Sequence, residues 1–275
     1  MPPLSTAEKT DSKIGFMLSK VPEVTLYFWI IKVLCTTIGE TASDFLQSTV
    51  NLGLTLTTLI TALVLAGVLF MQFRAKKYVP WVYWLSVVLI SVVGTQITDN
   101  LTDNFGVPLA ATTALFAIAL AIVFGLWYRV EHTLSIHSIR TTRREAFYWL
   151  AILFTFALGT SAGDWMAEGL NFGYLISALI FAGLIGVIAT VHYTGKALSA
   201  STHLAESGLT IAAFWGAYIL TRPLGASIGD YLSQAPADGG LGLGTTVTSG
   251  IFLLAILALV IFLSLTKRDT IKAAE

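Results

Sequence analysis

The chain repeats one pattern four times. In each copy an aromatic residue precedes a tryptophan, a glycine follows ten residues after that tryptophan, and an aspartate follows five residues after the glycine. The copies read FWIIKVLCTTIGETASD (28–44), YWLSVVLISVVGTQITD (83–99), YWLAILFTFALGTSAGD (148–164) and FWGAYILTRPLGASIGD (214–230). Such self-similarity indicates a tandem-repeat architecture in which each copy is one supersecondary unit.

Each copy continues through a short link containing glycine into a second apolar run. A run of about 20 apolar residues spans a hydrocarbon core of about 30 Å as a helix. The first helices are expected near residues 22–46, 80–102, 146–168 and 209–233, and the second near 54–73, 107–128, 174–194 and 245–266. The pattern therefore predicts eight transmembrane helices, two in each repeat.

The composition agrees with a chain that lies mostly in lipid. Of 275 residues, 55% are hydrophobic and 12% are charged, which is too apolar for a soluble domain of this length. We predict an all-α polytopic membrane protein. Basic and acidic residues balance at 16 each, so no nucleic-acid partner is expected. Cys35 is the only cysteine, and we expect it to be a small buried hydrophobe.

The positions of Lys and Arg predict the orientation. Fourteen of the sixteen lie at the chain ends and between repeats, so the positive-inside rule places both termini in the cytoplasm. Because each copy has an even number of spans, all copies insert the same way up, and a pseudo-fourfold ring or a two-plus-two arrangement is expected. The expected segments are a polar N-terminal tail (1–20), repeats at 21–74, 75–130, 131–196 and 197–267, and a polar C-terminal tail (268–275).

A column of residues spaced by four runs along each first helix, and this spacing keeps residues near one helix face. In the first repeat the column is Lys32, Thr36, Glu40 and Asp44. The equivalent residues are Val87, Ser91, Thr95 and Asp99; Ile152, Phe156, Thr160 and Asp164; and Tyr218, Arg222, Ala226 and Asp230. Charges within a membrane are costly and generally lie in protein-lined or wet interiors. We therefore expect the first helices to line the centre of the molecule.

Oxygen-bearing side chains of this column are the candidate cation path. The set comprises Thr36, Thr37, Glu40, Asp44, Thr95, Asp99, Thr160, Asp164 and Asp230. Glu40 and Asp44 are the candidate metal ligands. Lys32 and Arg222 are candidate counter-ions or gating groups, and Pro223 is expected to bend the helix beside Arg222. A packing role for the four aspartates stays open, because an aspartate near a helix end can also bond a neighbouring helix.

Two further sets of equivalent residues, glycines and tryptophans, recur in every copy. Small residues allow helices to approach closely, and Gly39, Gly94, Gly159 and Gly225 are expected to do so. Tryptophans gather at membrane interfaces, and Trp29, Trp84, Trp149 and Trp215 are expected to be anchors at the cytoplasmic interface. The histidines, His132, His137, His192 and His203, fall in or near the expected cytoplasmic loops, where we expect them to be solvated.

The repeat resembles a family of bacterial integral membrane proteins built from four tandem copies of a two-helix repeat of unknown function, each with a characteristic tryptophan. The resemblance covers residues 21–266. It rests on KVPEVTLYFWIIKVLCTTIGETASD, AFYWLAILFTFALGTSAGDW and FWGAYILTRPLGASIGD. It implies a location in the bacterial inner membrane and names no substrate.

Transport of a small cation is the function that the column favours. Carboxylate, hydroxyl and carbonyl oxygens suit hard cations such as Mn²⁺ or Mg²⁺. Manganese is the specific hypothesis, as a transported ion and not a tightly bound cofactor, with coupling to protons as an extension. The alternatives are an acidic-ring ion channel and a non-transporting scaffold or regulatory subunit.

An enzyme is not expected. The sequence holds no Ser/His/Asp set, no HExxH motif and no phosphate-binding glycine loop, so catalysis would depend on the acidic residues alone. The expected partners are the lipid bilayer, the cation or proton, and further copies of the chain in a homo-oligomer.

Overall fold

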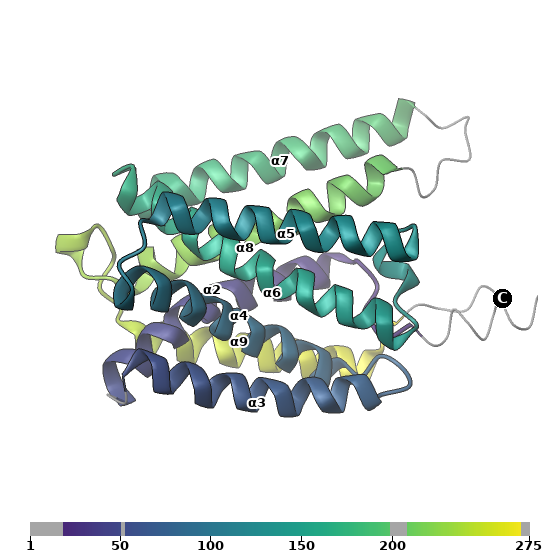
Figure 1. Cartoon of the computed structure of the whole chain (residues 1–275), viewed down its shortest axis with the longest axis horizontal. Coiled ribbons are helices and arrows are strands. Elements are labelled where there is room, and N and C mark those ends of the chain that lie inside the picture. Colours follow the sequence, from purple (N-terminus) through teal and green to yellow (C-terminus); the bar gives the residue numbers. More distant parts are fainter. Residues whose placement is uncertain (1–18, 51–52, 199–207, 271–275) are drawn as a thin grey trace, which may run out of the picture.

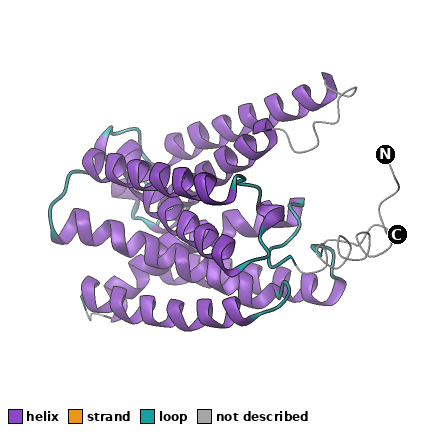
Figure 2. Cartoon of the chain, turned by 45° about the vertical axis from the view of Figure 1, so that its right-hand side comes forward, coloured by secondary structure: helices purple, strands orange, loops and turns teal. Residues whose placement is uncertain are grey.

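Eight long helices make up most of the protein. A computed structural model describes residues 19–50, 53–198 and 208–270, and all regular structure in these ranges is helical. The long helices are α2 (Leu26–Val50), α3 (Leu54–Arg74), α4 (Pro80–Asp99), α5 (Leu109–Glu131), α6 (Thr142–Asp164), α7 (Tyr174–Leu198), α8 (Gly208–Ser233) and α9 (Thr245–Thr266). They run mainly along the long axis of the molecule (Figure 1; Figure 2). Most of the expected N-terminal tail, His203 and Lys272 lie outside the described residues.

Four short elements follow or connect these helices. The π-helical turns η1 (Asn100–Asn104) and η3 (Trp165–Gly169) continue α4 and α6, and the 3₁₀ turns are η2 (Ile136–Ser138) and η4 (Pro236–Asp238). Helix α6 begins four residues before the expected start. The reason is a cap, because the Thr141 side chain accepts a hydrogen bond from the Arg144 amide at 3.3 Å and so satisfies an amide of the first turn.

The protein is a membrane protein by the length and composition of its helices. Six described helices are long and apolar enough to cross a membrane, namely α3, α4 with η1, α5, α6 with η3, α7 and α9. The other two, α2 and α8, contain the buried charged residues Lys32, Glu40 and Arg222. The expected membrane spans at α2 and α8 therefore stay predictions.

Helices α2, α4, α6 and α8 form the interior. Each packs on the next in a closed cycle, because α2 contacts α4, α4 contacts α6, α6 contacts α8 and α8 contacts α2. Within the most apolar 18-residue stretch of each helix, 72% of the residues of α4 and 61% of those of α6 are buried. The corresponding share is 22% for each of α3, α5 and α7 and 28% for α9. The first helix of each repeat thus lines the centre and the second faces outward.

Each outer helix packs on the inner helix of the next repeat. Helix α3 packs on α4, α5 on α6, and α7 on α8, whereas α2 and α3 of the same repeat barely touch. Helix α9 returns to pack on α2. Among the described helices, the last therefore closes the ring on the first.

The first and last described segments of the chain also contact each other. The Glu23 amide donates to the Asp269 carbonyl at 2.9 Å, and the Tyr78 hydroxyl donates to Asp269 Oδ2 at 2.5 Å. Burial raises the pKa of the Asp269 carboxyl. Lys20, expected in a polar tail, is instead buried and donates to Glu145 Oε2 at 2.7 Å and to the Phe73 carbonyl at 2.9 Å. The packed part of the chain therefore starts before the expected boundary.

The four repeat glycines lie where neighbouring inner helices come closest. A Cβ atom on Gly39 would lie 2.6 Å from Ser91 Cβ, and one on Gly94 would lie 2.8 Å from Phe156 Cβ. A Cβ on Gly159 would lie 2.5 Å from Arg222 Cβ, and one on Gly225 would lie 2.6 Å from Thr36 Cβ. Each glycine thus lies against the column residue of the next inner helix. Gly225 of α8 lies against Thr36 of α2 and so completes the cycle.

The tryptophans differ from the expectation. Trp84, Trp149 and Trp215 are 1%, 3% and 4% exposed, and Trp29 is partly buried. Trp215 Nε1 also donates to the Leu134 carbonyl at 2.9 Å. Three of the four repeat tryptophans are therefore packed inside the protein, and their depth relative to the membrane interface stays a prediction.

Replacing Gly225 with alanine tests the close approach. The added methyl group would overlap Thr36, and such overpacking typically costs ~1–3 kcal/mol. We expect a lower melting temperature in detergent. The matched control is Gly183→Ala in α7, where nothing lies within 4 Å of the added carbon and alanine favours the helix. Equal melting temperatures for the two variants would contradict the close packing.

Candidate cation site

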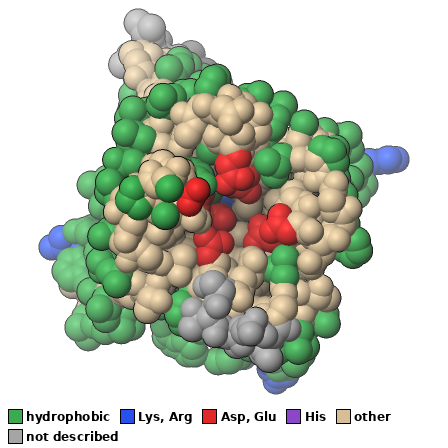
Figure 3. Space-filling model, turned by 90° about the vertical axis from the view of Figure 1, so that its left-hand side faces the viewer, with side chains coloured by type: hydrophobic (Ala, Val, Ile, Leu, Met, Phe, Trp, Pro, Cys, Tyr) green, Lys and Arg blue, Asp and Glu red, His purple; other side chains and the backbone are tan. Residues whose placement is uncertain are grey.

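Acidic side chains line a hollow at one end of the molecule (Figure 3). Asp44, Asp99, Asp164 and Asp230 come from the last turns of the four inner helices. Each of the four interacts electrostatically with Glu40, which lies one helical turn deeper on α2. The equivalent positions of the four repeats therefore converge on one place, as expected for a column that faces the centre.

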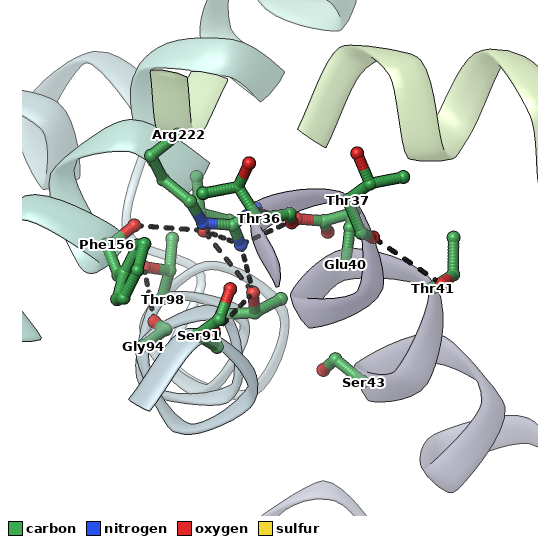
Figure 4. Close-up of polar contacts among 12 residues, drawn as sticks. Thr36, Thr37, Glu40, Thr41, Ser43, Ser91, Gly94, Thr98, Phe156 and Arg222 are labelled. Carbon is green, nitrogen blue, oxygen red and sulfur yellow. Dashed lines mark hydrogen bonds and ion pairs between the residues drawn. The ribbon is translucent and has the colours of Figure 1, made fainter. Parts of the chain in front are cut away.

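Arg222 fills the centre of the inner ring below these acids (Figure 4). Its side chain is fully buried, and its guanidinium reaches the three other inner helices. Nη1 donates to the Thr36 carbonyl at 2.9 Å, and Nη2 donates to Glu40 Oε2 at 2.9 Å. Nη2 also donates to the hydroxyls of Thr160, at 2.6 Å, and Thr95. Glu40, Thr95 and Thr160 occupy the same repeat position, so one arginine of the fourth repeat binds equivalent side chains of the other three.

Three carboxylates form the group best suited to a metal ion. One oxygen each of Glu40, Asp164 and Asp230 lies within 4.8 Å of the others. Glu40 and Asp230 are 6% exposed and Asp164 is half-buried. Carboxylate oxygens are the ligands that hard divalent cations prefer. We call Glu40, Asp164 and Asp230 the acid triad.

The other two column aspartates bind amide side chains. Asp99 Oδ2 accepts hydrogen bonds from Gln47 Nε2 at 2.9 Å and from Ser43 Oγ at 3.2 Å. Asp44 Oδ2 accepts one from Gln234 Nε2 at 3.2 Å. Asp44 thus has an amide partner just beyond α8 and is not one of the three carboxylates that meet, and its expected role as a metal ligand with Glu40 stays a prediction.

Lys32 lies on the polar face of α2, one helical turn before Thr36 and farther from the acidic end. Its side chain is fully buried, and Nζ has no hydrogen-bond partner. The ammonium instead lies 3.7 Å from the centre of the Phe156 ring and 4.1 Å from that of Tyr218. Aromatic faces attract a cation, so these rings are the stabilising contacts of Lys32.

A layer of aromatic residues closes the column beyond Lys32. It consists of the residues that precede the repeat tryptophans, which are Phe28, Tyr83, Tyr148 and Phe214. The hydroxyls of Tyr83 and Tyr148 lie 2.5 Å apart, and the ring centres of Phe28 and Phe214 lie 6.1 Å apart. The hollow is therefore open at the acidic end and sealed at the other.

The remaining predicted residues lie beside the site. Thr37 is buried, and its hydroxyl donates to the Val33 carbonyl at 3.1 Å. This hydrogen bond of the Thr37 side chain therefore stays within α2. Thr36 Oγ1 donates to the Thr221 carbonyl at 3.0 Å and links α2 to α8. Pro223 lies inside a continuous α8 and packs against Gly163 of α6.

Sequence reasoning missed two acidic residues at the rim. Asp103 and Glu168 lie in the π-helical turns η1 and η3, one turn beyond Asp99 and Asp164. Asp44 interacts electrostatically with both of them. The spacing of four, extended by one step in the second and third repeats, would have found both.

Removing one member of the Arg222–Glu40 pair should destabilise the fold. Breaking a buried ion pair leaves an uncompensated charge and typically costs ~3–5 kcal/mol. We expect Arg222→Gln and Glu40→Gln each to lower the melting temperature, and the double variant to lose less than the sum. Additive losses in unfolding measurements would show that the two groups do not interact.

Replacing Lys32 with methionine should leave the fold at least as stable. The change removes a buried ammonium that lacks a hydrogen bond, and an apolar side chain of similar length suits this site. We expect an equal or higher melting temperature than wild type. A marked loss of stability would mean that the ring contacts outweigh the burial of the charge.

Comparison with known protein families identifies the family of the repeat. The family described as Repeat of Unknown Function (DUF347) matches the chain four times, at residues 27–78, 82–133, 147–197 and 213–269. Searches of the curated proteins and of the solved structures found no match. Each family match pairs an inner helix with the outer helix that follows it in the sequence. Together the matches cover most of the chain, which therefore belongs to this family of four-repeat proteins of unknown function.

Proposed function

We propose that this protein transports a small cation across a membrane, through a path lined by the first helix of each repeat. The observation that carries the proposal is the acid triad, in which Glu40, Asp164 and Asp230 meet within 4.8 Å. Acidic side chains also line a hollow at one end of the molecule (Figure 3). Such a hollow concentrates cations at its opening.

The proposal includes the finer arrangement of the helices. All eight helices cross the membrane, with α2, α4, α6 and α8 in a pseudo-fourfold ring and both termini in the cytoplasm of a bacterial cell. The support is the closed cycle of inner-helix contacts and the concentration of Lys and Arg between repeats. Under this orientation the acid-lined hollow opens on the outer side of the inner membrane.

The ligand chemistry favours a hard divalent cation, with manganese as the leading candidate. The triad offers carboxylate oxygens, and the hydroxyls of Thr95 and Thr160 lie near Glu40 through their shared contact with Arg222. Oxygen ligands suit Mn²⁺ and Mg²⁺ better than Cu⁺. Metal ligands must be deprotonated, so the triad also couples metal binding to the release of protons.

A carrier fits the centre of the molecule better than an open channel. Arg222 occupies the centre of the ring, and the aromatic layer closes the column beyond Lys32. An ion could pass only after these groups moved. We therefore place the protein among carriers that expose a site to one side at a time.

The second candidate is a scaffold that transports nothing. Its specific support is the Arg222 network, since hydrogen bonds from one side chain to three neighbouring helices also hold a bundle together. In that case the acidic column serves packing alone. Flux measurements separate the two functions.

Uptake into proteoliposomes tests the transport function. We expect wild-type protein to move Mn²⁺, with Mg²⁺, Zn²⁺ and H⁺ measured in parallel, and Asp164→Asn and Asp230→Asn each to reduce Mn²⁺ flux at least tenfold. The matched control is Asp238→Asn, an exposed aspartate in η4, which should leave the flux unchanged. Wild-type protein that moves no cation, with triad variants that only melt earlier, would favour the scaffold.

A further inference from the structure

The guanidinium of Arg222 is held by oxygen atoms of the kinds that a metal ion would use. Its acceptors are the Glu40 carboxylate, the Thr36 carbonyl and the hydroxyls of Thr95 and Thr160. Carboxylate and carbonyl oxygens are the protein ligands of hard divalent cations. Arg222 therefore lies where a carboxylate and a carbonyl oxygen of α2 meet hydroxyl oxygens of α4 and α6.

Glu40 belongs to both assemblies. Its Oε2 atom accepts the hydrogen bond from Arg222, and the same carboxylate group completes the acid triad with Asp164 and Asp230. A divalent ion on the triad and a guanidinium on Glu40 would be two cations bound to one carboxylate, and like charges repel strongly where water is excluded. The two positions are therefore in competition.

Arg222 is also incompletely satisfied where it lies. Its Nε atom is buried and has no hydrogen-bond partner, although the side chain is fully buried. A buried donor without a hydrogen-bond partner costs free energy. Less free energy is therefore needed to move Arg222 away from Glu40. The next residue, Pro223, lies inside α8 and removes one backbone hydrogen bond from this turn, so the helix is locally easier to bend.

We propose that Arg222 is a tethered cation that occupies Glu40 in the metal-free state and leaves it when a hard divalent cation binds the acid triad. This inference rests on the proposed transport function. The metal ion binds the acid triad only when it displaces Arg222 from Glu40. When Arg222 returns to Glu40, it favours release of the metal ion. Arg222 thus lowers the affinity of the site and drives release.

Mn²⁺ binding to the purified full-length chain tests the exchange. Titration calorimetry with MnCl₂ should give at least tenfold tighter binding for Arg222→Gln than for wild type, because the competitor is gone. Mn²⁺ should also raise the melting temperature of Arg222→Gln more than that of wild type, since the metal then compensates Glu40. If this variant folds only when Mn²⁺ is present, that metal requirement is itself the expected result.

Two controls define the comparison. The double variant Glu40→Gln with Arg222→Gln keeps the site free of the competitor but removes one ligand, so its Mn²⁺ response should be small. Arg143→Gln changes an exposed arginine at the other end of the molecule and should bind Mn²⁺ as wild type does. Arg222→Lys keeps a positive charge and should bind more weakly than Arg222→Gln.

The outcomes separate the two proposals. Wild-type binding that Arg222→Gln leaves equal or weaker would overturn the competition and leave cation transport standing. Absence of Mn²⁺ binding in wild type and in every variant, together with absence of flux, would overturn both. Binding seen only in Arg222→Gln would overturn the exchange, because the arginine of wild type would then never leave Glu40 for the metal.

Discussion

The approach of four helices to a common axis is the constraint on which the rest of the protein depends. Each inner helix presents a glycine to the next, and the column residues Ser91, Phe156, Arg222 and Thr36 fit against those glycines in turn. A side chain in place of any of them would collide with the neighbouring helix. Without this approach the guanidinium of Arg222 could not reach three other helices, and a charge left alone in the interior would be too costly to bury.

The inner helices form a closed cycle of contacts, but their equivalent positions differ in chemistry. One repeat position holds Glu40, Thr95, Thr160 and Ala226, and the position one turn deeper holds Thr36, Ser91, Phe156 and Arg222. The small Ala226 and the long Arg222 lie on the same helix, so the fourth repeat supplies a cation to the acceptors of the other three. Divergence of equivalent positions has thus produced one central site from four similar helices.

The packing of the outer helices explains how separate repeats become one body. Each outer helix covers the inner helix of the following repeat, and α9 covers α2. No two-helix repeat therefore buries its own inner helix, which accords with the general instability of isolated repeats. The contacts of Asp269 with Glu23 and Tyr78 reinforce this closure at the chain ends.

The sequence by itself determined the repeat, the helices and the polar face. The period of four residues marks a helix face wherever it occurs, and it identified Glu40, the four aspartates and Arg222, while the glycine position identified the close contacts. The tertiary structure alone decided that one oxygen of Glu40 lies within 4.8 Å of Asp164 and Asp230, that Lys32 lies against Phe156 and Tyr218, and that three of the four repeat tryptophans are buried. These outcomes depend on which helices are neighbours and how each is rotated. Contacts between residues far apart in the chain set both, as between Gly39 and Ser91 or between Gly225 and Thr36, and a periodic local pattern carries no record of them.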